Sequence, residues 1–334
     1  MLIDTSPKHI LLTGGTGFFG KALLRHWKQQ VHAGIFMERV TLLSRNPELF
    51  VVNNPDLVNH SWLELVKGDI CEPSSLPRGK AFTHILHAAA DSTAGSQLKP
   101  GQRFDQIVNG TRNMLDLAVA CGAQRFLLTS SGGVYGAQTH DMQSIKEDCH
   151  SLPDPMDVAN SYSVAKRMAE HLCAIYSDAH GFTTVVARCF SFVGPDLPLH
   201  AHFAIGNFIR DALQADCITV QGDGSPLRTY LDQRDLARWL TTMLFKGRAS
   251  QAYNLGSDQA VSILDLANIV RNVVSPRKPI KVMDNLLANS NSNRNRYIPC
   301  IRKAQVELGL TLEFDLKEAI KFTANAHLHK SISR

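Results

Sequence analysis

The sequence predicts an α/β fold in which a doubly wound parallel sheet is joined to a smaller C-terminal α/β lobe that would bind substrate. Six short apolar runs occur in the first 190 residues, and helix-like segments lie between most of them. Strands that are apolar almost throughout and alternate with helices indicate a parallel sheet covered on both faces. From about residue 195, Pro and Gly become frequent and strand-like runs become short, which predicts the second lobe.

Each expected element follows from its local pattern. The predicted strands are residues 9–14, 39–44, 64–69, 84–89, 125–131 and 183–190. Helical spacing of apolar residues predicts helices over residues 20–31, 110–122 and 162–181, and the last two end on Gly, a helix-stop signal. Two short strands, residues 218–222 and 252–257, are expected to stand isolated in the second lobe.

The expected domain division follows the change of pattern. Residues 1–187 form the predicted nucleotide-binding domain, to which part of 215–245 returns, and residues 188–330 form mainly the substrate lobe. Residues 46–60 are expected to be a loop elaboration whose role the sequence does not indicate. The polar run 285–296 is expected to be a mobile loop.

Composition limits the class of protein. A chain with 44% hydrophobic and 19% charged residues is typical of soluble globular proteins. We expect no transmembrane helix, because no apolar run approaches about 18 residues. The N-terminus lacks a basic-then-apolar signal, so the cytoplasm is the expected location. Seven cysteines without a C-x-x-C pair favour reduced thiols over a disulfide framework.

The charged and metal-binding residue types are scattered. A net charge of +5 is spread along the chain without a basic block, so nucleic-acid binding is not expected. The excess suits an anionic small substrate or serves solubility alone. The 14 histidines form no H-E-x-x-H and no tight cluster with Asp, so no metal site is expected.

A glycine-rich turn lies between the first predicted strand and helix. Residues 13–20 read TGGTGFFG, with Gly14, Gly17 and Gly20 in G-x-x-G-x-x-G spacing. The first glycine permits a tight turn, the second lets the backbone approach a pyrophosphate, and the third lets the helix pack on the strand. The helix N-terminus then offers N–H groups to phosphates. This context predicts a dinucleotide-binding, Rossmann-like domain.

Two groups of residues suggest redox chemistry. Tyr162 and Lys166 are spaced by four residues on a predicted helix, so they share one face. A nearby ammonium favours the phenolate form of a tyrosine, which would otherwise be a poor acid/base at pH 7. Ser131 ends a predicted strand, where hydroxyls face the ligand crevice of an open parallel sheet. The alternative is a surface Tyr and Lys on a helix.

The end of the second strand bears on the choice of cofactor. Enzymes that select NAD usually place an acidic residue there for the ribose 2′-hydroxyl. This chain has Ser44 and Arg45 instead, which favours NADP(H) and leaves NAD(H) possible. Alternatively, Arg45 stacks on adenine or faces water.

Taken in order, TGGTGFFG, HAAA (87–90), TSSGGVYG (129–136), YSVAK (162–166) and ARCFSFVGP (187–195) resemble the extended short-chain dehydrogenase/reductases, the NAD-dependent epimerase/dehydratase group. The resemblance covers about residues 8–325. It implies Tyr162 as acid/base, Lys166 as its electrostatic partner and Ser131 as the group that polarises a sugar oxygen.

The resemblance also implies binding residues. For the cofactor they are Gly14, Thr16, Gly17, Phe18, Phe19, Gly20, Ser44, Arg45, Asp69, Ile70, Ala88, Ala89, Ala90, Asn109, Thr129, Tyr162, Lys166 and Phe192. For a nucleotide-diphosphate sugar they are Ser131, Ser191, Asn207 and Arg228. Arg228 could instead be a solvated loop arginine, and Asn207 a helix cap. Ser191 stands where asparagine is frequent, which leaves its substrate contact open.

One departure from the group bears on the reaction. Members that dehydrate sugars usually carry an Asp-Glu pair after the active-site hydroxyl, and here Gly132 and Gly133 follow Ser131. Together with Ser44 and Arg45 at the end of the second strand, this departure predicts reduction of a 4-keto-6-deoxy nucleotide sugar. The alternative is a nucleotide-sugar 4-epimerase with tightly bound NAD, and a 4,6-dehydratase, a decarboxylase or a non-catalytic NADP sensor is less favoured.

By resemblance, the helices near residues 103–121 and 160–180 would form a homodimer, and surface polysaccharide synthesis would be a setting for the enzyme. The sequence specifies neither the nucleotide, nor the sugar, nor the stereochemistry of the product.

Overall fold

The structure, a computed structural model, describes residues 8–35, 38–90, 98–139, 141–201, 203–283 and 295–332. Most of the polar run 285–296 lies outside these residues. The described residues divide into two compact units. The first unit comes from Met1–Val134, Pro153–Arg188 and Ala237–Tyr253, and the second from Tyr135–Leu152, Cys189–Leu236 and Asn254–Arg334.

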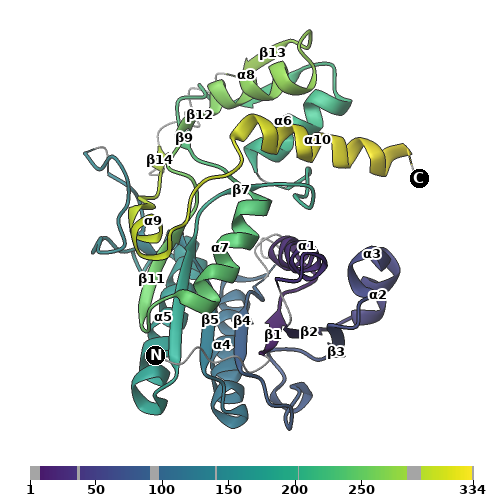
Figure 1. Cartoon of the computed structure of the whole chain (residues 1–334). Helices are drawn as coiled ribbons and strands as arrows, with labels where there is room; N and C mark the ends of the chain where they lie inside the picture. Colours follow the sequence, from purple (N-terminus) through teal and green to yellow (C-terminus); the bar gives the residue numbers. More distant parts are fainter. Residues whose placement is uncertain are drawn as a thin grey trace. The chain divides into compact units, whose positions relative to one another are not determined.

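A seven-stranded sheet is the core of the first unit, and six of its strands match the six predicted runs (Figure 1). In spatial order the strands are β11 (Gln251–Leu255), β6 (Thr183–Cys189), β5 (Arg125–Ser131), β4 (His84–His87), β1 (His9–Thr13), β2 (Arg39–Ser44) and β3 (Leu63–Lys67). The pairs from β3 across to β5 are all parallel. The predicted doubly wound α/β fold is confirmed.

The strand register aligns the carboxyl-terminal parts of β1, β2, β4 and β5. Thr13, the last residue of β1, lies opposite Leu43 of β2 and His87 of β4. His87 in turn lies opposite Leu128 of β5. The segments that follow these strands therefore leave the same edge of the sheet, which is where ligands bind in open α/β folds.

The last strand corrects the sequence analysis. Residues 252–257 were expected to form an isolated strand of the second lobe, but β11 lies beside β6 as the edge of the main sheet. Arg188 ends a segment of the first unit, next to the expected boundary at residue 187, and residues 237–253 return to that unit, so that 237–245 fall within the expected 215–245. A five-residue strand buries its apolar side chains by extending an existing sheet, which local pattern does not reveal.

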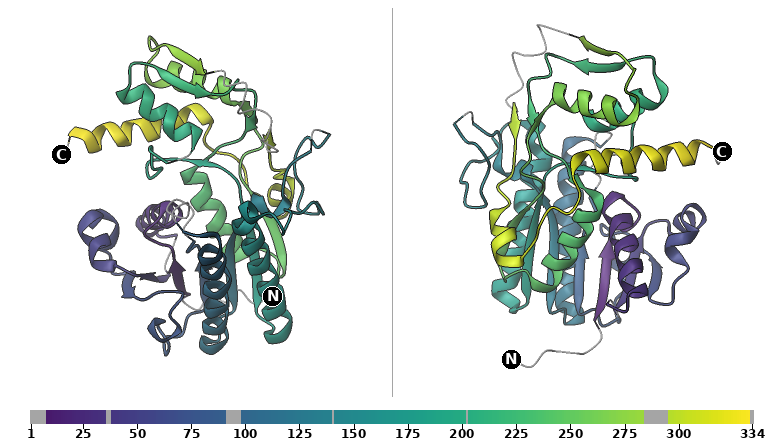
Figure 2. Two further views of the ribbon diagram at one scale, coloured as in Figure 1. Left: turned by 180° about the vertical axis from the view of Figure 1, so that it is seen from behind. Right: turned by 45° about the horizontal axis from the view of Figure 1, so that its top comes forward.

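Helices cover both faces of this sheet (Figure 2). α1 (Phe18–His32) and α7 (Gln233–Lys246) lie on one face, where the Trp27 indole N–H donates to the Thr241 hydroxyl at 3.0 Å. α4 (Pro100–Cys121) and α5 (Ser161–His180) pack together on the other face. Both end at a glycine in the left-handed conformation, as their sequences predict.

The core under α4 and α5 is apolar and fully enclosed. Leu11 and Ile85 from the sheet, Met114 and Leu115 from α4, and Ala169 from α5 are all completely buried. Such packing is not directional, so directional polar contacts between α5 and the strands add a further constraint on its position.

The segment expected as a loop at 46–60 forms two short helices instead. α2 (Pro47–Asn53) begins after Asn46, whose side-chain oxygen accepts a hydrogen bond from the Leu49 amide. α3 (Pro55–Val58) also has proline at its first position. Proline at that position and an Asn cap are helix-start signals.

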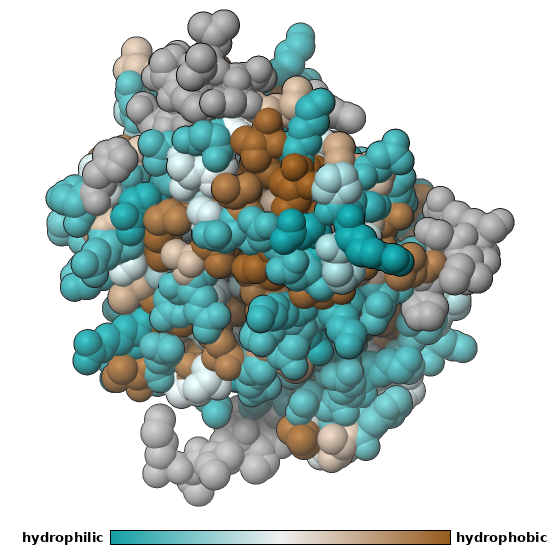
Figure 3. Space-filling view, turned by 90° about the horizontal axis from the view of Figure 1, so that it is seen from above, coloured by the Kyte–Doolittle hydropathy of each residue, from teal (hydrophilic) through white to brown (hydrophobic). Residues whose placement is uncertain are grey.

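The second unit is built from short elements. They are β7 (Phe192–Val193), α6 (Ala204–Gln214), β8 (Ile218–Gln221), β9 (Leu227–Arg228), β10 (Leu231–Asp232), β12 (Val261–Ser262), α8 (Ile263–Val274), β13 (Ile280–Met283), β14 (Arg296–Tyr297), α9 (Arg302–Leu308) and α10 (Leu316–Ile332). α6 packs against α8, and β8 pairs with β13. On the face drawn in Figure 3, apolar side chains are interspersed with polar ones.

Three further properties concern the described part of the chain. It contains no helix with the length and hydropathy needed to cross a bilayer. Within it, no group of three or more His, Cys, Asp or Glu residues could hold a metal ion. All seven cysteines are free thiols.

Candidate active site

The glycine turn has the geometry that its sequence predicts. Gly14 has a φ of +70°, and a Cβ there would lie 2.5 Å from the carbonyl oxygen of Ala88. A Cβ on Gly20 would lie 2.1 Å from the Cα of Gly15, so the first turn of α1 rests directly on the loop. Only glycine fits at these two positions.

The same turn leads into α1 without a side-chain cap. Gly17 precedes the helix without any side-chain cap, and no acidic residue occupies the first helical turn. The positive end of the helix dipole at such a start suits a negative phosphate. These observations fit a dinucleotide, with Thr16, Phe18 and Phe19 partly exposed around the turn.

The predicted adenine side is formed by the turn after β3. Asp69 Oδ1 accepts the Cys71 amide at 2.9 Å, and Ile70 is buried. Asn109, predicted to support the cofactor from α4, is exposed. The α4 residue that reaches this turn is Asn113, whose side-chain amide donates to the Ile70 carbonyl at 2.8 Å. Asn113 is four residues further along α4, one helical turn from the predicted residue.

The predicted cofactor residues Ser44 and Arg45 lie at the end of β2, and Arg45 acts on the Asp69–Cys71 turn. The Ser44 hydroxyl accepts the Asn46 amide at 3.2 Å, and Arg45 is exposed. Burial and the Asp69 carboxylate raise the pKa of the Cys71 thiol, and the Arg45 charge opposes this rise. Arg45 therefore lies within electrostatic range of the Asp69–Cys71 turn, where it could meet a 2′-phosphate.

A buried network centred on Thr13 and His87, two residues for which the sequence predicted no role, joins the strand ends. His87 Nδ1 is hydrogen-bonded to the Thr13 hydroxyl at 2.7 Å, and the Ala89 N–H donates to that same hydroxyl oxygen at 3.2 Å. The Thr129 hydroxyl donates to the His87 carbonyl at 3.3 Å. Burial, together with the positive charge of Lys166, lowers the pKa of His87 to about 3. The imidazole is therefore neutral, and it fixes the segment of Ala88–Ala90 against β1.

The predicted catalytic residues lie at the carboxyl end of β5 and in the first turns of α5. Lys166 is buried, and its ammonium donates to the Thr129 carbonyl at 2.8 Å. The same nitrogen lies 5.9 Å from the centre of the Tyr162 ring, so its charge acts on the phenol. Ser131, two residues after Thr129, accepts the Gly133 amide at 3.1 Å. Tyr162 and Ser131 are both partly exposed.

Gly133, which stands in place of one member of the acidic pair, lies close to two hydroxyl groups. A Cβ on Gly133 would lie 2.6 Å from the Ser163 hydroxyl and 3.3 Å from the Ser131 hydroxyl. Any side chain there would have to displace one of these groups. The chain therefore presents hydroxyl groups, and no acid or base, at this position.

An ion pair that was not predicted from the sequence lies one turn beyond Lys166. Glu170 of α5 accepts the Ser130 hydroxyl at 2.5 Å, and Arg188 Nη2 donates to its second oxygen at 2.8 Å. The side chains of Arg188 and Glu170 are only 14% and 11% exposed. A carboxylate four residues after Lys166, within the buried stripe of the helix, was the available signal.

The other predicted residues belong to the second unit. Ser191 and Phe192 are partly buried at the start of β7. Asn207 lies inside α6 and not at its cap, and its side-chain oxygen accepts Arg210 Nη1 at 3.3 Å. Arg228 is partly buried on β9, paired with Val261 and Tyr297, so it is not a solvated loop residue.

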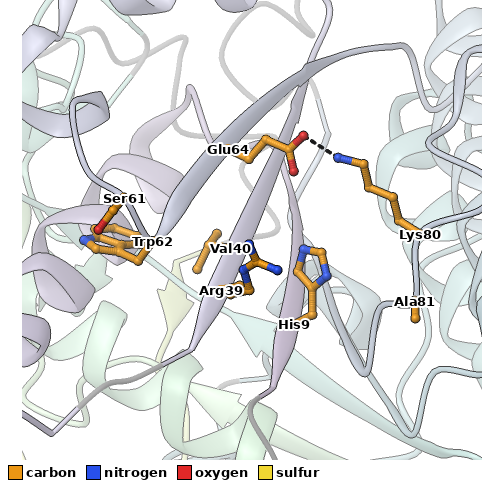
Figure 4. Close-up of a pocket in the computed structure, with 8 residues that line it drawn as sticks. All are labelled: His9, Arg39, Val40, Ser61, Trp62, Glu64, Lys80 and Ala81. Atoms are coloured by element: carbon orange, nitrogen blue, oxygen red, sulfur yellow. Dashed lines mark hydrogen bonds and ion pairs between the residues drawn. The ribbon is translucent and has the colours of Figure 1, made fainter.

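A polar groove of about 460 Å³ lies at the other end of the strands (Figure 4). It is lined by His9 and Arg39 at the amino ends of β1 and β2, by Trp62, and by the ion pair of Lys80 with Glu64. Burial and the neighbouring cations lower the pKa of His9. No residue predicted from the sequence lines this groove, so it is separate from the dinucleotide site.

The fold and the glycine turn thus define a doubly wound α/β protein of the dinucleotide-binding type, and the comparisons name its family. Residues 10–256 match the NAD-dependent epimerase/dehydratase family. The chain therefore belongs to that family, and the resemblance is confirmed.

Individual relatives differ in their printed activities. UDP-glucuronic acid decarboxylase 1 of Danio rerio is 30% identical over 336 residues, 99% of this chain and 76% of that protein. The dTDP-glucose 4,6-dehydratase DesIV of Streptomyces venezuelae, solved with NAD, has a TM-score of 0.82 at 22% identity and covers 97% of this chain and 98% of its own. RMD of Pseudomonas aeruginosa, solved with NADPH, has a TM-score of 0.77 at 23% identity, covering 97% and 99%. These two structures support the fold.

Proposed function

We propose that the chain is an NAD(P)-dependent oxidoreductase that acts on a nucleotide-diphosphate sugar. The observation that carries the proposal is Lys166, buried and held by the Thr129 carbonyl, with its charge beside the Tyr162 ring. A tyrosine so placed can exchange a proton at a sugar oxygen. When bound, the nicotinamide would supply or accept the hydride.

The chain's own residues would divide the remaining work. Tyr162 gives its proton to the carbonyl oxygen at C4, and the fixed charge of Lys166 stabilises the phenolate that remains. Ser131 hydrogen-bonds the same oxygen. Gly14, Gly17 and the N-terminus of α1 hold the pyrophosphate. Arg228, Ser191 and Asn207 are the proposed contacts to the nucleotide diphosphate and the sugar.

The specific reaction that we propose is reduction of a 4-keto-6-deoxy nucleotide sugar with NADPH. Two features support it. Gly132 and Gly133 provide neither the acid nor the base that removal of water across C5–C6 would need, and Ser44 and Arg45 stand where NAD-selecting enzymes carry an acidic residue. Epimerisation at C4 with retained NAD would use the same residues and is the alternative.

Decarboxylation of a nucleotide uronic acid is a second candidate, and the identity to a UDP-glucuronic acid decarboxylase favours it. Once C4 of such a sugar is a ketone, the electrons of the C5–C6 bond can flow into it as CO₂ leaves. This step needs no protein base at C5, so Gly132 and Gly133 do not argue against it. Tyr162 would again exchange the proton at the C4 oxygen.

One experiment separates these reactions. The purified protein is incubated with a 4-keto-6-deoxy nucleotide sugar and NADPH, and separately with UDP-glucose and UDP-glucuronate and NAD. Loss of NADPH equal to product formed supports the reductase. CO₂ release from UDP-glucuronate, or epimer formation without net cofactor change, refutes it in favour of the corresponding alternative.

A tyrosine variant checks the residue assignment in whichever reaction is found. Tyr162→Phe should lower kcat by at least about 100-fold, because general acid–base catalysis contributes that much or more. Dinucleotide affinity, measured by fluorescence titration, should stay within about twofold, since the ring remains. A fully active variant would contradict the assignment.

We also propose that α4 and α5 form the interface of a homodimer. Both helices bury one face on the sheet yet leave Val119, Met168 and Ile175 between 38% and 48% exposed. Light scattering after size exclusion should give twice the mass of the 36.9-kDa chain. Met168→Glu and Ile175→Glu should yield the monomer, and an unchanged mass would refute this interface.

A further inference from the structure

The position of α5 along β5 decides where Tyr162 and Lys166 lie relative to Ser131. Ser131 belongs to the strand, whereas Tyr162 and Lys166 belong to the helix. The buried face of α5 carries the small residues Ala165 and Ala169. Apolar contacts are not directional, whereas hydrogen bonds and ion pairs hold particular atoms against one another, so polar contacts add a constraint on the register.

Two hydrogen bonds join α5 to neighbouring residues near the end of β5. Lys166 donates to the Thr129 carbonyl at 2.8 Å, and Glu170 accepts the Ser130 hydroxyl at 2.5 Å. Lys166 is itself part of the proposed chemistry. Glu170 lies one turn further from Tyr162 and serves as the contact that is independent of the reacting groups.

Arg188 holds the Glu170 carboxylate in place. Its Nε lies 3.2 Å from both carboxylate oxygens, and its Nη2 lies 2.8 Å from one of them. Arg188 belongs to β6, which lies beside β5 in the sheet. A single buried carboxylate thus ties one helix to two adjacent strands by groups with fixed directions.

We propose that Glu170, held by Arg188 and bonded to Ser130, is a positioning residue that sets the register of α5 on β5 and so places Tyr162 and Lys166 beside Ser131. The inference rests on the proposed function, because it assumes that these three residues act on one substrate. It differs from a purely structural role in that it concerns spacing at the site and not the stability of the fold.

The test uses two double variants that leave no unpaired charge. Glu170→Leu with Arg188→Met removes the contact, and replacing a buried ion pair by apolar residues of similar volume is often neutral for stability. Glu170→Gln with Arg188→Met removes the same charges but keeps an oxygen that accepts the Ser130 hydroxyl. Asp178→Asn, an exposed change on the same helix, is the control.

The two double variants are expected to differ in kcat. With thermal midpoints close to wild type, the Leu/Met pair should lower kcat at least about tenfold, since displacement of reacting groups by about 1 Å can cost 100-fold. The Gln/Met pair should recover most of this loss. Unchanged kcat in a folded Leu/Met protein, or no recovery in the Gln/Met protein, would overturn the proposal.

A second readout does not depend on the sugar. Hydrogen exchange of the α5 amides near Tyr162, and the dissociation constant for NADPH or NADH, are measured for the same proteins. Faster exchange and several-fold weaker binding in the Leu/Met pair, restored in the Gln/Met pair, support the proposal even if wild type uses none of the sugars tested. Failure of the wild-type protein to use these sugars would refute only the proposed substrate class. If the Leu/Met and Gln/Met proteins have the same exchange rates and the same dissociation constants, the positioning role is refuted.

Discussion

The buried His87 should make the first unit sensitive to acid. In the folded protein its pKa is lowered to about 3 from the ordinary 6.5, chiefly by burial and further by Lys166. Between these two pH values the unfolded chain binds a proton that the folded chain does not. The stability that neutral His87 allows is therefore complete above pH 6.5 and is lost as the pH falls toward 3.

The size of the effect follows from the two pKa values. Each unit of pKa difference corresponds to about 1.4 kcal/mol. For a shift from 6.5 to about 3, the linkage relation gives a loss of about 2 kcal/mol between about pH 7.5 and about pH 5. His87→Asn places an amide near the position of Nδ1 and removes the titrating group, so this part of the pH dependence should vanish.

Tryptophan fluorescence is the appropriate probe. All three tryptophans, Trp27, Trp62 and Trp239, belong to the first unit, which also contains His87. Urea unfolding at the two pH values gives the free energy of unfolding of wild type and variant. The free energy of unfolding of wild type minus that of the variant should change by about 2 kcal/mol between the two pH values.

A histidine variant elsewhere in the first unit serves as the control for His87→Asn. His180→Asn changes an exposed imidazole at the end of α5 and should leave the pH dependence as in wild type. If His87→Asn also shows the wild-type pH dependence, the neutral, buried imidazole does not account for acid sensitivity. His87→Gln serves as the second variant should the Asn protein fail to fold.

Two further predictions concern the cofactor side of the site. Arg45→Asp should weaken NADPH binding by about 10- to 100-fold, the value of a charge-assisted hydrogen bond, and leave NADH binding nearly unchanged. An unaltered ratio of the two dissociation constants would assign Arg45 no part in cofactor choice. Gly20→Ala should lower the thermal midpoint and abolish dinucleotide binding, because its Cβ would lie 2.1 Å from Gly15. Gly101→Ala, where no heavy atom lies within 4 Å of the new Cβ, is the matched control and should bind normally.

Much of the first unit could be predicted because its signals are local. Apolar runs identified six strands, and Gly122 and Gly181 marked two helix ends. The turn of Gly14 and Gly20 was predicted from spacing, since a backbone that must approach another closely admits only glycine. The cap at Asn46, read as part of a loop, was also a local signal and was overlooked.

Contacts between distant segments could not be predicted in this way. Thr13 and His87 are 74 residues apart, and Glu170 and Ser130 are 40 apart, so neither pair leaves a local pattern. The Asn113 side chain donates to the Ile70 carbonyl from 43 residues away, and this contact likewise leaves no local pattern. The edge strand β11 likewise depends on an unfilled position beside β6.

The sequence by itself determined the strand–turn–helix with its glycines, the Tyr162–Lys166 spacing and the family, because periodicity and backbone freedom act between near neighbours. Tertiary structure alone decided that His87 is neutral, that Lys166 is held by Thr129, and that Glu170 and Arg188 tie α5 to β5 and β6. The physical reason is that burial and charge pairing depend on which segments pack together, and folding brings those segments from 18 to 74 residues apart.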